Sequence, residues 1–119
     1  MRKLEDICGK ETAEKVRAND PSLIKLVLRG GRPVPNINDK NMEGIIESLK
    51  ENTFISKLVL AENDISDQGL NGIGVLKHIT YLDLSNNDLS DGCLDKLSEM
   101  EQLTFLDLGG SNNLSGKFL

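Results

Sequence analysis

A spacing of 24 residues between matching segments is the feature that most constrains how this chain can fold. The segment 79–89 follows the pattern L-x-x-L-x-L-x-x-N-x-L, which is filled by Ile79, Leu82, Leu84, Asn87 and Leu89. The segment 55–65 fills the same pattern 24 positions earlier, and residues 103–108 begin it again 24 positions later. Such a period is typical of chains that stack short structural units, because no single unit can bury its apolar side alone.

The two halves of each unit are predicted to differ in secondary structure. Alternate residues of a strand point in opposite directions, so Leu82 and Leu84 are expected to point inward while Tyr81 and Asp83 point outward. Asn87 follows this strand, where its side-chain amide could satisfy backbone groups of the neighbouring unit. The return segments match at the same spacing: Leu70 with Leu94, Ile73 with Leu97, and Leu76 with Met100. We therefore predict an α/β fold, a right-handed solenoid with a parallel sheet on its concave side and helices on its convex side.

The chain is expected to form one domain with two parts. Residues 1–20 are predicted to be an N-terminal helical cap, in which Gly9 divides two short helices and Pro21 marks the end. Residues 21–119 are predicted to hold the repeats, with about four strands and an incomplete last repeat.

The convex segments are expected to vary in regularity. Residues 30–35 indicate an irregular turn, and a helix is predicted at about 39–51 with Asn38 or Asp39 as its N-cap. The apolar residues of this helix share one side: Met42, Ile45, Ile46 and Leu49. The next segment is weakened as a helix by Gly69, Gly72 and Gly74, so we expect one or two turns, or partly 3₁₀ structure.

Residues 21–114 resemble the leucine-rich-repeat superfamily. The segments Ile-Ser-Asp-Gln-Gly-Leu (65–70) and Leu-Ser-Asp-Gly-Cys-Leu (89–94) look like the ribonuclease-inhibitor-like class of that superfamily, whose convex segments are helical. Bacterial effectors with 24-residue repeats are also similar. These resemblances imply a non-enzymatic protein-binding fold.

A narrower resemblance covers residues 19–60. The segment 19–23, the turn that contains Pro35, and the segment 49–53 are similar to the C-terminal repeat domain of tropomodulin. That family caps actin filaments at the pointed end, so this resemblance implies that actin is a candidate partner.

Composition and charge exclude several classes of function. A net charge of −5 argues against general binding to nucleic acid or to anionic membranes. No apolar run approaches the roughly 18 residues that a membrane span needs. Residues 1–8 have no apolar core of a signal peptide, so we expect a cytoplasmic location. Cys8 and Cys93 lack the spacing of metal ligands, and we expect both to be buried free thiols.

The sequence contains no catalytic constellation. His78, the single histidine, is expected on the surface and far from both cysteines. Paired glycines at 30–31 and 109–110 follow strands, but they lack the helix and the lysine of a phosphate-binding loop. We therefore expect no enzyme activity, no cofactor and no metal site.

The repeat register predicts which outward side chains are neighbours on the concave face. One column reads Lys25, Lys57, Tyr81, Phe105, and the next reads Val27, Val59, Asp83, Asp107. With Arg29 from a third column, these nine residues are the predicted partner-binding set. The face runs from basic at its N-terminal end to aromatic and acidic at its C-terminal end.

Two explanations of this face are open. Adjacent outward aromatics such as Tyr81 and Phe105 are typical of interface hot spots, but they could instead only pack on each other. Val27 and Val59 are also favourable strand formers, and Asp83 and Asp107 could simply keep the face soluble.

The C-terminal end breaks the pattern. Ser111 occupies the asparagine position, and the chain ends at residues 117–119 with no further convex helix. Either the chain continues in a longer protein, or Phe118 and Leu119 fold back over the core, or two copies pair through this edge. The sequence thus predicts a protein–protein interaction module, with a tropomodulin-like actin-capping protein or a fragment of a bacterial effector as alternatives.

Overall fold

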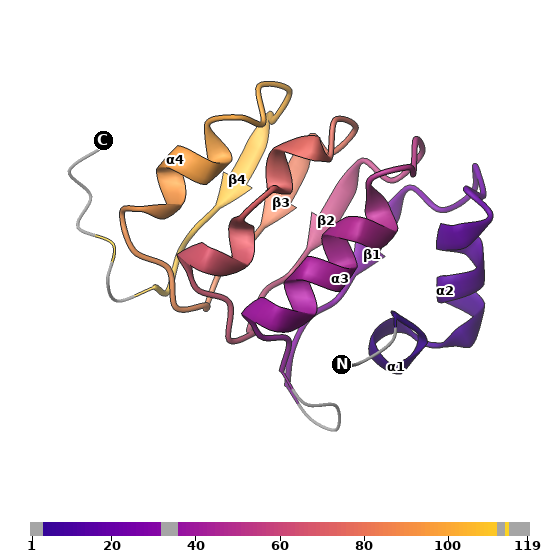
Figure 1. Cartoon of the computed structure of the whole chain (residues 1–119), viewed down its shortest axis with the longest axis horizontal. Helices are drawn as coiled ribbons and strands as arrows, with labels where there is room; N and C mark the ends of the chain where they lie inside the picture. The colour runs from indigo at the N-terminus through magenta and orange to yellow at the C-terminus, as the bar shows by residue number, and fades with distance from the viewer. Residues whose placement is uncertain (1–3, 32–35, 112–113, 115–119) are drawn as a thin grey trace.

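Four short parallel strands form one sheet in the described part of the chain, with the spatial order β1-β2-β3-β4 (Figure 1). The computed structural model describes residues 4–31, 36–111 and 114. The strands are β1 (Lys25–Val27), β2 (Lys57–Val59), β3 (Tyr81–Asp83) and β4 (Phe105–Asp107). Neighbouring strands pair in parallel and in the predicted register, so the fold class expected from the repeat is confirmed.

The inward leucines of the pattern form the core. Leu58, Leu60, Leu82 and Leu84 are fully buried, as the alternation of the strands predicts. Leu106 differs, because it lies in the last described strand and is 38% exposed. The core is therefore closed along the interior repeats and thinner at β4.

Helices and 3₁₀ turns cover the convex side and lie in front of the sheet in Figure 1. These elements are α3 (Asp39–Leu49), the 3₁₀ turns η1 (Asp67–Leu70) and η2 (Ile73–Val75), and α4 (Cys93–Leu97). The second convex segment is 3₁₀ in both parts, one of the forms left open by its glycines. Gly72, which separates η1 from η2, has a φ of 81°, a conformation that glycine adopts at little cost.

The helix α3 begins with a reciprocal cap. Asn38 accepts a hydrogen bond from the backbone N–H of Asn41, and the Asn41 side chain accepts one from the N–H of Asn38. The predicted apolar side of α3 is buried. The helix ends at Leu49, two residues before the predicted end, and Asn52 orders the turn that follows by accepting bonds from the N–H groups of Phe54 and Ile55.

Two short helices precede the sheet: α1 (Leu4–Cys8) and α2 (Lys10–Arg17). They are separated at Gly9, whose φ is 89°, as predicted. Ala13 and Val16 are buried in the same core as the repeats. The side chain of Asn19 bonds to Thr53, which ties the end of α2 to the turn before β2. The division of the chain into a cap and repeats at residue 20 stays a prediction.

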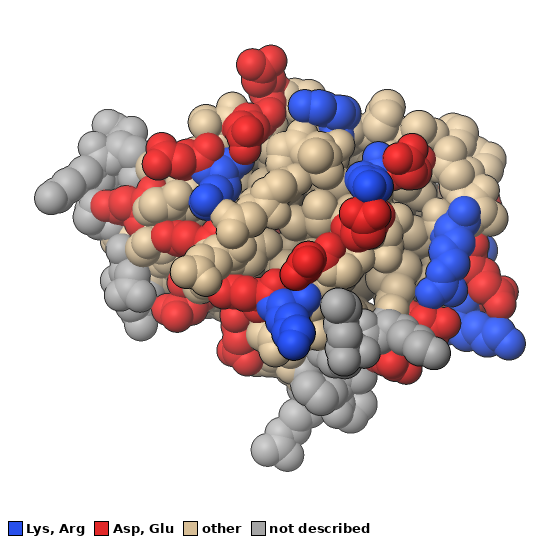
Figure 2. All heavy atoms as spheres, viewed as in Figure 1, with Lys and Arg blue, Asp and Glu red and all other residues tan. Residues whose placement is uncertain are grey.

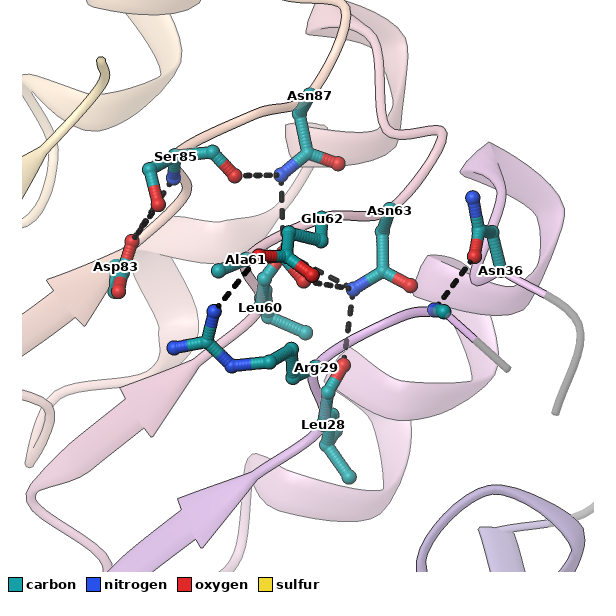
Figure 3. A network of polar contacts seen from close by, with 11 residues as sticks. Leu28, Arg29, Asn36, Leu60, Ala61, Glu62, Asn63, Asp83, Ser85 and Asn87 are labelled. Atoms are coloured by element: carbon teal, nitrogen blue, oxygen red, sulfur yellow. Dashed lines mark hydrogen bonds and ion pairs between the residues drawn. The ribbon is translucent and has the colours of Figure 1, made fainter. Parts of the chain in front are cut away.

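Two asparagines join successive repeats through buried hydrogen bonds (Figure 3). The Asn63 amide donates to the carbonyls of Leu28, Leu60 and Ala61, and its Oδ1 accepts from the N–H of Ile37. The Asn87 amide donates to the carbonyls of Leu60, Leu84 and Ser85, and its Oδ1 accepts from the N–H of Ile65. Each amide therefore bonds to its own repeat and to the one before it, as the pattern predicts.

Ser111 takes this place in the last repeat. Its hydroxyl donates to the carbonyl of Asn87 and accepts from the N–H of Leu89. A serine can bond to the preceding repeat, but it lacks the donors that an amide directs at its own strand.

The predicted turn at Pro33–Pro35 and the predicted roles of Phe118 and Leu119 lie outside the described residues.

The two cysteines are both free, but they differ in burial. Cys93 is fully buried, whereas Cys8 is only half-buried, so the expectation of two buried thiols is correct for Cys93 alone. Burial, reinforced by the charges of Asp67 and Asp91, raises the pKa of the Cys93 thiol to about 11. Burial also raises the pKa of Cys8.

We expect the two thiols to react at different rates with iodoacetamide. At pH 8 a thiol whose pKa is about 11 is ionised in about one molecule in a thousand, and only the thiolate is nucleophilic. Mass spectrometry should therefore find Cys8 alkylated first and Cys93 alkylated only after denaturant is added. Equal rates for both thiols in the native protein would contradict the burial of Cys93.

Candidate protein-binding face

The predicted columns lie side by side on the sheet. Lys25, Lys57, Tyr81 and Phe105 are aligned across the four strands, and so are Val27, Val59, Asp83 and Asp107. The concave face is defined here as the side of the sheet that carries these eight residues and Arg29. The neighbour relations predicted from the repeat are confirmed, whereas a role of these residues in binding stays a prediction.

Two aromatic rings stack at the C-terminal end of the concave face. The ring centroids of Tyr81 and Phe105 are 4.1 Å apart, with an angle of 5° between the planes. The ammonium nitrogen of Lys57 lies 5.9 Å from the centroid of the Tyr81 ring, within the range of a cation–π contact. Phe105 remains 42% exposed although one side of its ring contacts Tyr81.

The aspartates beside these rings are held by local hydrogen bonds. Oδ1 of Asp83 accepts from the N–H and the hydroxyl of Ser85, at 2.9 Å and 2.7 Å. Oδ1 of Asp107 accepts from the N–H of Gly109 at 2.9 Å. Both side chains are half-buried. Within the described residues no group of three or more metal-ligating side chains is assembled, so these aspartates do not form part of such a cluster.

The N-terminal end of the concave face is basic and partly apolar. Arg29 forms an ion pair with Glu62 at 3.1 Å, and both side chains are about half exposed. An exposed pair of this kind stabilises the fold by only about 0–1 kcal/mol. Lys25 is exposed, and Val27 in the edge strand is 50% exposed.

Val59 needs a correction as a contact residue. It points to the concave face but is only 5% exposed, because it lies in an interior strand with neighbours on both sides. Ala61, the next outward residue, is fully buried. Val59 therefore stabilises the sheet and offers a partner almost no surface.

Comparison with known proteins agrees with this geometry. A sequence profile of the family described as "Leucine Rich repeat" matches residues 51–74 and 75–98, the two interior units. Residues 51–98 are leucine-rich repeats, and the described sheet has the arrangement of a leucine-rich-repeat solenoid. Each matched segment is 24 residues long, which is the spacing that places β2 and β3 in register.

A solved structure titled "Leiomodin-1 Actin-Binding Site 2" is similar to this leucine-rich-repeat protein over nearly all of its length. The match has a TM-score of 0.73 and 21% sequence identity, and it covers 99% of this chain and 69% of the other. At that identity the likeness shows the shared fold. No curated protein matches the sequence.

The convex side of this leucine-rich-repeat protein is mainly acidic around its C-terminal half. Figure 2 shows Asp and Glu side chains spread around α4 and the 3₁₀ turns with a few Lys and Arg among them, and a further group of Lys and Arg near α2. Two open hollows lie on this side, one between α3 and η1, lined by Asp39, Glu43 and Gln68, and one beside Gly74 and Glu99.

His78 is exposed, as predicted. No helix among the described residues is long and apolar enough to cross a membrane.

Sequence reasoning missed an apolar group near the start of β1. Ile24 is 53% exposed, and Phe54, in the turn before β2, is 41% exposed. The repeat register could have indicated that Ile24 is exposed, because the matching positions in the other repeats are the polar residues Ser56, Thr80 and Thr104. The register could not predict the ion pair of Arg29 with Glu62, because Glu62 lies in a turn and strand pairing does not determine its neighbours.

Proposed function

We propose that this leucine-rich-repeat protein is a non-enzymatic module that binds a protein partner through its concave face. The stack of Tyr81 on Phe105 carries the proposal. It places two of the few aromatic side chains on the side of the sheet that no helix of the described chain covers, and it leaves 42% of Phe105 exposed. Aromatic anchors surrounded by polar residues are typical of the energetic centre of protein interfaces.

Packing of the rings on each other does not by itself account for this placement. A cross-strand aromatic pair stabilises a sheet by only about 0.2–1 kcal/mol. The pair is also flanked by Lys57 and by two aspartates that are fixed by hydrogen bonds. A rigid aromatic centre with oriented charges around it suits recognition.

Replacing both rings should separate binding from folding. We expect Tyr81→Ala with Phe105→Ala to keep the circular dichroism spectrum, and to lower partner affinity by at least about 30-fold, which corresponds to about 2 kcal/mol. The measurement is capture by the tagged protein, followed by titration of the captured protein. The matched control is Val75→Ala, an exposed apolar residue on the convex side.

The outcomes of this experiment decide the proposal. Capture by the wild type and by Val75→Ala, but not by the double variant, supports binding through the concave face. Undiminished capture by a folded double variant contradicts it.

Actin is a second candidate partner. It is supported by the similarity of the fold to a solved actin-binding site of leiomodin-1, which extends over 99% of this chain, and by the likeness of residues 19–60 to tropomodulin. Cosedimentation with filaments and pointed-end assembly assays test it, and no effect in either assay would remove this candidate. If the chain is a fragment of a bacterial effector, we expect it to bind its partner through the same surface.

Self-association through the β4 edge stays a prediction. Leu106 in this strand is 38% exposed, which offers apolar surface to a second copy. Light scattering over a range of concentrations tests the idea, and a mass that stays monomeric at high concentration would remove it.

A further inference from the structure

The aromatic stack already holds a cation at one of its ends. Along the column, Lys57 lies over one side of the Tyr81 ring, and Phe105 lies against the other side. Phe105 is the last residue of this column in the described sheet, and it is 42% exposed. The stack is therefore bounded by a lysine at its inner end and by exposed ring surface at its outer end.

Negative charge without a matching cation lies beside that outer ring. Asp83 and Asp107 are directly paired across β3 and β4, where side chains are about 4.8 Å apart. Like charges opposite each other on a sheet are destabilising. No ion pair formed among the described residues includes either carboxylate, and their local hydrogen bonds involve only Oδ1. A cation bound at this place would relieve the repulsion.

We propose that Phe105 and Asp107 bind the side chain of an arginine in the protein partner. The inference rests on the proposed function and names the chemistry that the concave face recognises. The guanidinium group would lie flat on the exposed side of the Phe105 ring and would donate hydrogen bonds to the Asp107 carboxylate, with Asp83 adding to the negative potential.

The spacing and the chemistry favour arginine over lysine. Phe105 and Asp107 are two residues apart on one face, a separation of about 6.6 Å along the strand, which a group lying over the ring can bridge. A planar guanidinium stacks on an aromatic face and still donates from its edge, whereas a compact ammonium does so less well and is more strongly hydrated. Lys57 over Tyr81 shows that the same column accommodates a cation above a ring.

The test is an NMR titration of the whole chain with three blocked tripeptides at about 0.15 M salt, where the Debye length is about 8 Å. The central residue is arginine, lysine or citrulline, the last being the uncharged analogue of arginine with nearly the same shape. We expect saturable shifts of the Phe105 ring and the Asp107 amide with the arginine peptide, a weaker response with lysine, and none with citrulline.

Two protein variants and one control define the site. Asp107→Asn and Phe105→Leu should each weaken binding of the arginine peptide by about two- to fivefold, the range of an exposed cation–π or ion-pair contact. Asp95→Asn, an exposed residue of α4 on the convex side, should leave binding unchanged. Equal shifts with citrulline and arginine, or no shift at Phe105 with arginine, would overturn the inference.

This result is separable from the test of the proposed function. If Asp107→Asn still captures the partner at full affinity while the double aromatic variant does not, the concave face binds a partner without the arginine contact. If the double aromatic variant captures the partner as well as the wild type does, the proposed function itself fails.

Discussion

Asn87→Ala is expected to lower the free energy of unfolding by about 2–3 kcal/mol. The Asn87 side chain is buried and forms four hydrogen bonds, three as donor and one as acceptor. Alanine would leave the N–H of Ile65 and the carbonyls of Leu60, Leu84 and Ser85 without these partners. Because these bonds connect the second and third repeats, their loss weakens the packing between the two repeats.

Thermal and urea unfolding measure this effect. Asn71→Ala is the matched control, since Asn71 is exposed and the change should stay within about 0.5 kcal/mol. Asn87→Asp is a sharper companion, because it keeps the shape and the acceptor but turns an oxygen toward three carbonyls. It should destabilise at least as strongly as alanine. Wild-type stability in both Asn87 variants would mean that the repeats are held together without the amide.

Gly30→Ala is expected to be at least as damaging, with a loss of more than about 3 kcal/mol. A β-carbon on Gly30 would lie 1.9 Å from the carbonyl oxygen of Glu62 and 2.6 Å from Oδ1 of Asn63. The first contact is with backbone, so the segment that follows β1 would have to move away from the second repeat. That movement would also strain the hydrogen bond from the N–H of Gly30 to the carbonyl of Ala61.

A second glycine separates this clash from ordinary backbone strain. Gly72 has a φ of 81° but open space where a β-carbon would lie. Gly72→Ala should therefore cost only about 1–2 kcal/mol, the usual penalty for a left-handed alanine. Similar midpoints in urea for the two variants would contradict the close approach at Gly30.

Much of the fold follows from the repeat, because inward leucines at a fixed spacing allow only one register. If the register slipped by one residue, Leu82 and Leu84 would point to solvent, so the pairing of β2 with β3 is specified by burial alone. The hydrogen bonds of Asn63 and Asn87 to the preceding repeat were predictable as well, because the same register determines where each asparagine lies. The 3₁₀ form of η1 and η2 was left open, because glycines weaken an α-helix without choosing its replacement.

Less of the candidate face could be predicted. The columns of outward residues were correct, since strand pairing determines them. The accessibility of these residues was not predictable from the columns. Val27 and Val59 occupy the same column, but Val27 lies in an edge strand and is exposed, whereas Val59 lies in an interior strand and is buried. The stack of Tyr81 on Phe105 at 4.1 Å depends on rotamers that the sequence pattern does not specify.

The most direct test of the central claim is site-specific crosslinking. A photoreactive phenylalanine analogue would be placed at Phe105 on the concave face and, in a second protein, at Val75 on the convex side, both of which are exposed. After illumination with a captured partner, we predict a covalent adduct from position 105 and none from position 75. An adduct from position 75 alone would contradict binding through the concave face.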